Sequence, residues 1–156
     1  MATHNTDVAA GQLAALTNSV RDLVDGTKVT GDIRMLESIY TTDATEVTGA
    51  VIRIGVLPVG AYLLPEKCWA FSEGIGGTTI IATSIGDQAD DDRYATADLA
   101  LTAASTILLP FVPLAAILLA RHKITAASNI ITATLTGTFP ATAAKKIIWH
   151  LEYRMP

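Results

Sequence analysis

The sequence is poor in cysteine, in charge and in aromatic side chains, and each shortage excludes a class of protein. The single cysteine, Cys68, excludes an internal disulfide. Only 17% of the 156 residues are charged, whereas about a quarter are charged in average soluble chains. The 11 lysines and arginines are scattered, so we find no basic face for nucleic acid. The polar start, Met1–Asp7, does not resemble a secretion signal.

Apolar residues, in contrast, are abundant. Half of the chain is hydrophobic, although aromatic residues make up only 6% of it. Most of this apolar content is alanine, isoleucine, leucine and valine. One small domain has little interior for so much apolar surface, and obligate interfaces between subunits resemble a core cut in half. The composition therefore favours a protein that packs against other chains.

Alternating apolar residues predict a series of short strands with no helices between them. The predicted strands are Asp32–Tyr40, Val51–Leu57, Cys68–Ser72, Thr78–Ile85, Ile131–Phe139 and Lys146–Arg154. Glycine and proline turns separate them. This spacing is typical of a mainly β protein, and it predicts a jelly-roll-like antiparallel β-sandwich over residues 31–156. In the second strand we expect Ile52, Ile54 and Val56 on one face. In the third we place Trp69 in core-like alternation, as we do Trp149 in the last.

The first 30 residues have a different pattern. Leu13, Leu16, Val20 and Leu23 recur at helical spacing, and Asp25 and Gly26 follow as a stop signal. We therefore predict an N-terminal helix or arm over residues 1–30. Its apolar stripe is a candidate contact for a neighbouring subunit.

The segment Leu99–Ala120 carries no charge and is long enough to span a membrane. Pro110 and Pro113 lie inside it, where they would break a helix. We therefore expect two buried strands, 106–109 and 114–119, joined by a proline corner. A membrane-associated protein built on this segment remains an alternative.

Glycines, histidines and the cysteine suggest no catalytic chemistry. The glycine-rich stretch 74–77 lacks the lysine of a phosphate loop and is interpreted as a hairpin turn. His4, His122 and His150 are not paired at ligand spacing. We expect His122 in a solvated loop and His150 half-exposed on a strand. Cys68 has no predicted activating partner. We expect no enzyme activity, no cofactor and no resident metal.

The densest charge cluster is an acidic loop. It comprises Asp87, Asp90, Asp91, Asp92, Arg93 and Tyr94. The spacing does not match an EF-hand, although several carboxylates in one loop are able to hold a cation. A solvated turn is the simplest interpretation. A third is docking onto the lysines and arginines of a partner, and on that interpretation these six residues are candidate partner contacts.

Several phrases of the sequence resemble one group of proteins. They are Val29–Glu37, Ala50–Pro58, Leu64–Glu66, Ile85–Asp87, Asp91–Tyr94 and Tyr153–Pro156. Their succession is similar to that in small virion proteins of tailed bacteriophages, in particular the cement or decoration proteins that bind the outside of the capsid. The resemblance implies a β-sandwich, often a homotrimer, that is made in the host cytoplasm, binds the major capsid protein and sits on the capsid surface. It implies no cofactor and no membrane.

Two related interpretations stay open at the level of sequence. The chain resembles virion proteins generally, so it also fits a minor head or tail component. A jelly roll that binds host glycans is the other alternative. The low aromatic content counts against glycan binding, because aromatic side chains commonly stack on sugar rings.

Overall fold

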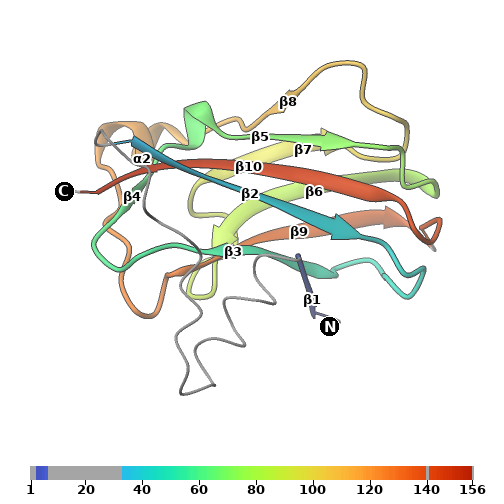
Figure 1. Ribbon diagram of the computed structural model, residues 1–156, viewed down its shortest axis with the longest axis horizontal. Coiled ribbons are helices and arrows are strands. Elements are labelled where there is room, and N and C mark those ends of the chain that lie inside the picture. Colours follow the sequence, from blue (N-terminus) through green and yellow to red (C-terminus); the bar gives the residue numbers. More distant parts are fainter. Residues whose placement is uncertain (1–2, 7–32, 140, 156) are drawn as a thin grey trace.

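The protein is mainly β, with two sheets and very little helix (Figure 1). The computed structural model describes residues 3–6, 33–139 and 141–155. One sheet has the order β1–β3–β9–β6–β7, with bounds Thr3–Asn5, Val51–Val56, Ile130–Thr138, Thr78–Asp87 and Ala95–Ala100. The other has the order β2–β10–β5–β8, with bounds Ile33–Thr41, Lys146–Arg154, Trp69–Ser72 and Leu109–Pro110. Strand β4 (Tyr62–Leu63) also pairs with β10, and the described helical segments are η1 (Pro65–Lys67) and α2 (Ala115–Leu119).

The longest strands are those with the clearest alternation in the sequence. In β10, Ile147, Trp149 and Leu151 are all fully buried, because every second side chain of a strand points to the same face. This strand pairs with β2 over its whole length, from Lys146 opposite Thr41 to Arg154 opposite Ile33. The predicted strands 32–40 and 146–154 are thereby confirmed, and they pair antiparallel with each other.

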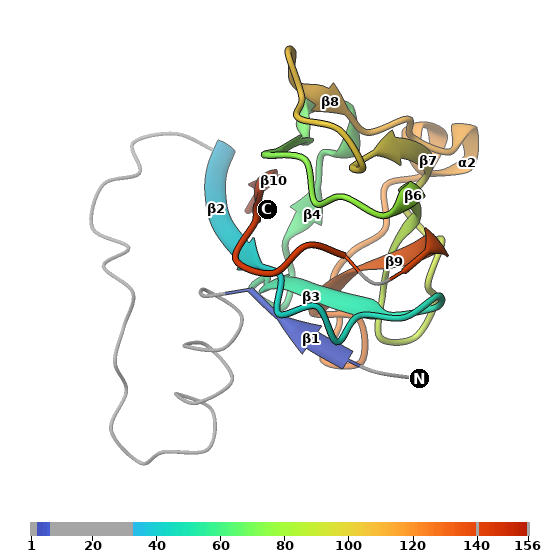
Figure 2. The ribbon, with the colours of Figure 1, turned by 90° about the vertical axis from the view of Figure 1, so that its right-hand side faces the viewer.

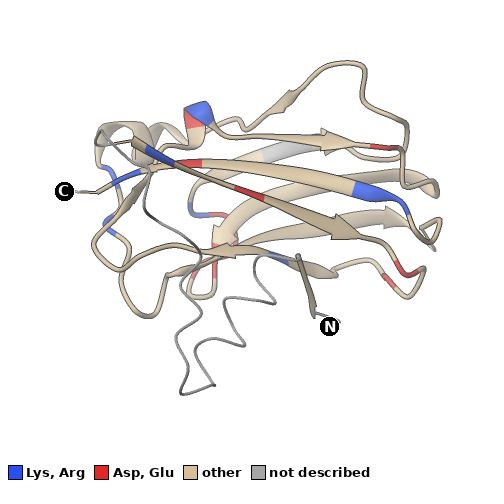
Figure 3. Cartoon of the chain, in the orientation of Figure 1, with Lys and Arg blue, Asp and Glu red and all other residues tan. Residues whose placement is uncertain are grey.

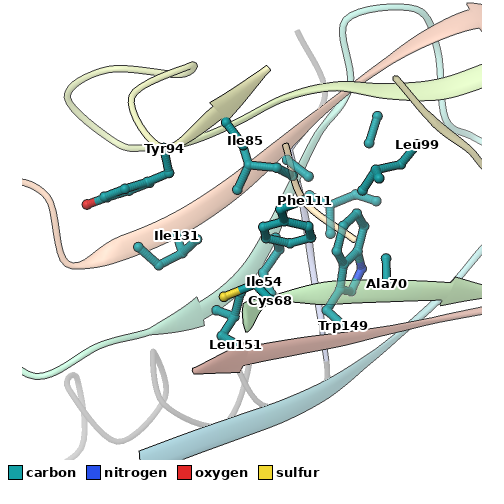
Figure 4. Close-up of a cluster of buried hydrophobic side chains, with 14 of the residues drawn as sticks. Ile54, Cys68, Ala70, Ile85, Tyr94, Leu99, Phe111, Ile131, Trp149 and Leu151 are labelled. Atoms are coloured by element: carbon teal, nitrogen blue, oxygen red, sulfur yellow. The ribbon is translucent and has the colours of Figure 1, made fainter. Parts of the chain in front are cut away.

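One hydrophobic core lies between the two sheets. Ile85, Leu99 and Ile131 enter it from the first sheet, and Trp149 and Leu151 enter it from the second (Figure 4). Few of these side chains are aromatic, so the core is filled mainly by branched aliphatic residues. Such cores are close-packed, and their stability depends on each large side chain.

Two predicted strand faces were wrong. In β3 the pairing register shifts between Arg53 and Gly55, so Leu57 rather than Val56 points into the core. A bulge of this kind reverses the faces beyond it. In β5 the small Ala70 lies opposite Trp149 and is buried, whereas Trp69 lies on the outer face. Trp149 fills the interior at this level, and only a small neighbour fits beside it.

The uncharged segment also differs from the prediction. The predicted strand 106–109 is reduced to the two residues of β8, and the predicted strand 114–119 is wrong, because Ala115–Leu119 is the short helix α2. Pro110 lies in an edge strand, where the missing amide donor costs no ladder hydrogen bond. The longest helix among the described ranges has five residues, and none of them has the length and apolar character needed to cross a bilayer.

The N-terminal region contains a strand that the sequence did not predict. Thr3–Asn5 forms β1, which runs parallel to β3 and pairs His4 with Ile52 (Figure 2). The predicted helical stripe of Leu13, Leu16, Val20 and Leu23 lies outside the described residues. The boundary near residue 30 and the partner role of that stripe stay predictions.

The glycine-rich stretch 74–77 forms a turn, as predicted, but not a hairpin. Gly74, Gly76 and Gly77 have φ values of 82°, 75° and 70°. Residues with a side chain rarely adopt this left-handed conformation, which explains the cluster of glycines. The turn carries the chain from β5 in one sheet to β6 in the other.

Candidate functional site

Exposed apolar side chains are concentrated in the segment of the chain that includes β8 and α2. We call this set the uncharged surface, and it consists of Ile107, Leu108, Val112, Leu118 and Leu119. These are five of the nine large hydrophobic side chains exposed in the described part of the chain, and Leu119 is 89% exposed. Figure 3 shows neither β8 nor α2 coloured for charge. An apolar patch of this kind on a folded protein commonly marks a contact with another macromolecule.

Buried anchors fix the uncharged surface to the sheets. Phe111 and Ile117 point inward and are buried, and the amide of Phe111 donates to the carbonyl of Cys68. Beyond α2, the guanidinium of Arg121 donates two hydrogen bonds to the Glu66 carboxylate, from Nη1 to Oε2 at 2.7 Å and from Nη2 to Oε1 at 2.5 Å. These contacts fix the backbone that carries the exposed side chains. Because that backbone is already ordered, less conformational entropy is lost when a partner binds.

The edge of one sheet lies within this surface. Strand β8 is the last strand of its sheet, and among the described residues it pairs with β5 alone. An open edge with apolar neighbours is normally covered or blocked, because it invites pairing with another chain. Here the segment Leu99–Ala120 supplies no charge to block it, but β8 has only two residues, and one of them is Pro110, which lacks the amide donor that a further strand would need.

The acidic loop folds around a buried carboxylate. Asp87 accepts hydrogen bonds from the amides of Ala89 and Asp90, at 2.9 and 3.1 Å. Its other oxygen accepts from Nε of Arg93 at 2.7 Å. Asp87 is buried in the subunit, so it holds the loop together and does not reach a partner.

Tyr94 is the second residue of this loop that points inward. It is almost fully buried, and burial together with the nearby Asp87 charge raises its pKa well above the ordinary phenol value. Neither Tyr94 nor Asp87 is available for docking, which corrects the prediction for these two residues. The outer residues are Asp90, Asp91, Asp92 and Arg93, and their role as partner contacts stays a prediction.

Three neighbouring carboxylates form the outer part of the loop. Oxygen atoms of Asp90, Asp91 and Asp92 lie within 4.8 Å of one another. A hydrogen bond to Asp90 and the charges of both neighbours raise the pKa of Asp92. Three carboxylates this close together attract a positively charged group, which is either a protein side chain or a cation.

We predict that Gly86→Ala distorts this loop. A Cβ atom at Gly86 would lie 2.2 Å from the carbonyl oxygen of Asp90, and backbone cannot move aside as a side chain can. We expect a loss of about 2–4 kcal/mol in the free energy of unfolding, as for other substitutions that overpack or strain a site. Urea denaturation measures it.

Gly55→Ala is the matched control for Gly86→Ala. The nearest atoms to its Cβ belong to the flexible side chain of Leu36, at 3.0 Å and beyond. We therefore expect a clearly smaller loss at Gly55. Equal losses at the two positions would contradict the tight packing assigned to the loop.

The acidic loop and the uncharged surface adjoin each other. Ala95 forms a bridge with Pro113, and the amide of Leu114 donates to the carbonyl of Tyr94 at 3.2 Å. Backbone contacts thus join the two features that were identified separately in the sequence. The sequence carried both signals but not their proximity, because more than 15 residues separate Tyr94 from α2.

His122 lies at the same end of the molecule and is half-buried rather than solvated, which corrects the prediction. Its Nε2 lies 3.1 Å from Oγ of Ser128, and its ring meets the Tyr94 ring edge to face at 6.1 Å. Burial, and next the charge of Arg93, lower the pKa of His122. The folded protein therefore favours the neutral imidazole.

This predicts a pH effect on stability. Because the pKa of His122 is lower in the folded state than in the unfolded state, the unfolded chain binds the proton first as the pH falls. The free energy of unfolding should decrease below pH 6.5, the unfolded value, and His122→Gln should reduce that decrease. Denaturation at pH 7.5 and pH 5.5 tests this. An identical pH dependence in the variant would contradict it.

His150 and Cys68 are the two remaining residues that were considered for catalysis, and both are buried in the fold. His150 is buried, not half-exposed as predicted, and its ring stacks on Trp69 at 4.7 Å with the planes 5° apart. Its Nδ1 lies 3.2 Å from Oε1 of Glu37. Cys68 is buried, and burial raises the pKa of its thiol to about 12. The thiol stays protonated at neutral pH and is a poor nucleophile.

Comparison with known proteins gives no match by sequence, but solved structures match, and two of them are described here. No protein-family model and no curated protein matches the chain. A chain of the cyanophage Pam1 capsid asymmetric unit is 17% identical, with a TM-score of 0.56, and the match covers 88% of this chain and 95% of that one. A chain of the capsid of Ralstonia phage GP4 is also 17% identical, with a TM-score of 0.53 and 99% of both chains covered. The protein therefore shares its fold, over nearly the whole length, with chains in two phage capsids.

Proposed function

We propose that this protein is a bacteriophage capsid cement, or decoration, protein. It binds the outside of the assembled shell of major capsid protein and stabilises it. The observation that carries the proposal is the whole-chain match to chains of similar length in two phage capsids. The likeness covers 95% and 99% of those chains, so it extends over almost the whole of each.

We propose that the fold is a jelly-roll sandwich. Successive strands alternate between the sheets, apart from the pairs β4–β5 and β6–β7, and the strand orders are β2–β10–β5–β8 and β3–β9–β6–β7 with β1 added. Two four-stranded sheets connected in this way make the double Greek key of a jelly roll. The shared core of the two sheets supports the same interpretation.

The protein acts as a homotrimer, with the uncharged surface as the contact between copies. Interfaces between identical subunits are more apolar than other interfaces, and their centres are depleted of charge. The uncharged surface has both properties. A closed ring of copies covers this surface on every subunit.

The acidic loop is the part of this region suited to the shell. Asp91 and Asp92 are exposed, and their charges favour lysines and arginines on the major capsid protein. Partner binding of this kind requires no turnover, cofactor, nucleic acid or membrane. The protein is made in the host cytoplasm and ends on the capsid surface.

Stabilisation follows from mass action. A protein that binds only the assembled shell lowers the free energy of that state relative to the open or dissociated one. Each copy contributes a modest affinity, and three linked copies raise the overall affinity because the second and third contacts are intramolecular. The expected result is a shell that resists heat and internal pressure.

Co-sedimentation tests the proposal. Purified protein is added to heads of the encoding phage that were assembled without it, and separately to dissociated major capsid protein. We expect saturable binding to heads at a fixed ratio to the major capsid protein, and little binding to the dissociated subunits. Heads that leave the protein in the supernatant at all concentrations would contradict the proposal.

A host-glycan-binding module remains the second candidate, because one observation favours it. Trp69, which was predicted to face the core, and Phe71 both lie on the outer face of β5. Outward aromatic rings are the usual platform for sugars, although His150 covers one face of Trp69. Glycan-array binding that is lost in Trp69→Ala would support this candidate over the first.

A further inference from the structure

Three potential metal ligands converge at the end of the molecule where β1 joins the sheet. His4 belongs to β1, and Asp43 and Glu46 belong to the loop between β2 and β3. One ligand atom from each of the three lies within 4.8 Å of the others. Sequence spacing did not predict this group, because nearly 40 residues separate the histidine from the carboxylates.

The environment of Glu46 gives independent evidence that this group of residues binds a ligand. It is 1% exposed, yet its Oε2 atom has no hydrogen-bond partner among the described residues. Its other oxygen accepts from the hydroxyl of Tyr40 at 2.5 Å and from the amide of Asp43 at 3.1 Å. Burying a carboxylate oxygen without a hydrogen-bond partner is unfavourable, and a bound cation would offset this cost.

His4 presents a second atom of the same kind. Its Nε2 atom is buried and has no hydrogen-bond partner among the described residues. The ring is held against Tyr40, edge to face, at 5.9 Å between centroids. Tyr40 therefore contacts the histidine with its ring and Glu46 with its hydroxyl. Ligands oriented by neighbouring groups in this way are typical of metal sites.

We propose that His4, Asp43 and Glu46 bind one divalent transition-metal ion of the Zn²⁺ class. One imidazole nitrogen and two carboxylate oxygens form a ligand set suited to zinc, with water as the fourth ligand. Calcium and magnesium prefer oxygen ligands throughout, which disfavours them here.

The geometry requires only a small closure. Atoms bound to one tetrahedral zinc lie about 3.3 Å apart, given bond lengths near 2 Å. Asp43 is exposed, and its Oδ1 atom accepts from the amide and the hydroxyl of Thr45, so an ion would take its other oxygen, Oδ2. Glu46 need not leave its buried position.

The ion would clasp the N-terminal strand to the body of the protein. Strand β1 has three residues, and within the described ranges its one partner strand is β3. A metal that bridges it to the loop 42–50 adds a second attachment. The inference does not depend on the proposed function, since it concerns the subunit alone.

Titration calorimetry of the chelator-treated full-length protein with ZnCl₂ tests the site. We expect one ion per chain, and binding weakened at least tenfold in His4→Gln and in Glu46→Gln. His122→Gln and Asp92→Asn are the matched controls, because one removes a histidine and the other a carboxylate elsewhere. Both should bind as the wild type does.

A second measurement keeps the test independent of folding defects at the buried Glu46. In the wild type, Co²⁺ should give a visible spectrum of a low-coordinate site, which His4→Gln should abolish while its circular dichroism is unchanged. The proposal is overturned if no stoichiometric ion binds. It is also overturned if His4→Gln binds normally, or if Asp92→Asn removes the ion and thereby assigns it to the acidic loop.

Discussion

Asp87→Ala is expected to lower the free energy of unfolding by about 3–5 kcal/mol. The carboxylate is buried and accepts three hydrogen bonds, two from backbone amides and one from Arg93. Its removal leaves these donors unsatisfied and breaks a partly buried ion pair, which is strongly destabilising. For a domain of this size, such a loss lowers Tm by roughly 6–15 °C. Thermal and urea denaturation measure the effect.

Asp92→Ala is the matched control, since it is the same substitution in the same loop. Asp92 is exposed and lies among like charges that raise its pKa. Removing its charge relieves repulsion, so we expect unchanged or slightly higher stability. Comparable destabilisation at the two positions would contradict the inward role of Asp87.

Ile107→Asp is expected to dissociate the oligomer and, with it, to abolish tight attachment to the shell. A carboxylate placed in an apolar interface without a partner costs several kcal/mol, and about 3 kcal/mol corresponds to a roughly hundredfold loss of affinity. The isolated subunit should stay folded, because Ile107 is 71% exposed and contributes little to the core. Light scattering measures the mass, and co-sedimentation measures shell binding.

Met35→Asp provides an internal standard for Ile107→Asp. Met35 is also 71% exposed, but it lies on β2, at the other edge of the same sheet. Both variants remove an equally exposed apolar side chain and add one negative charge. We expect Met35→Asp to keep its mass and its shell binding. A trimeric Ile107→Asp that fails only on the shell would instead assign the uncharged surface to the capsid contact.

The strands could be predicted because their side chains alternate over many residues. In β10 and β9 the alternation is nearly unbroken, and the predicted and observed bounds agree to within a residue. The failures lie where local geometry changes the register or the face. The alternation of apolar and polar residues does not reveal the bulge after Arg53. Nor does it reveal that the small Ala70 lies opposite Trp149.

The uncharged surface shows a different limit of sequence patterns. A run of apolar residues indicates that the side chains are buried, but not whether they are buried within the subunit or against a partner. Leu99 and Phe111 are buried in the subunit, whereas Leu119 in the same run is exposed. Pro110 and Pro113 were the local signals that regular strands would not continue there.

The acidic loop and the metal-ligand group depend on contacts that only the folded chain provides. The sequence identified the loop but not the inward direction of Asp87, which is set by its hydrogen bonds with the following turn. His4 and Glu46 meet because β1 adds to the sheet beside β3, and a three-residue strand has too short a pattern to predict.

Electron cryomicroscopy of phage heads saturated with the purified protein tests the central claim most directly. We predict ordered density for the two-sheet domain on the outer shell surface, in groups of three, with residues 107–119 at the contact between copies and the acidic loop toward the shell. Heads without such density, or density in which residues 107–119 face solvent, would contradict the account.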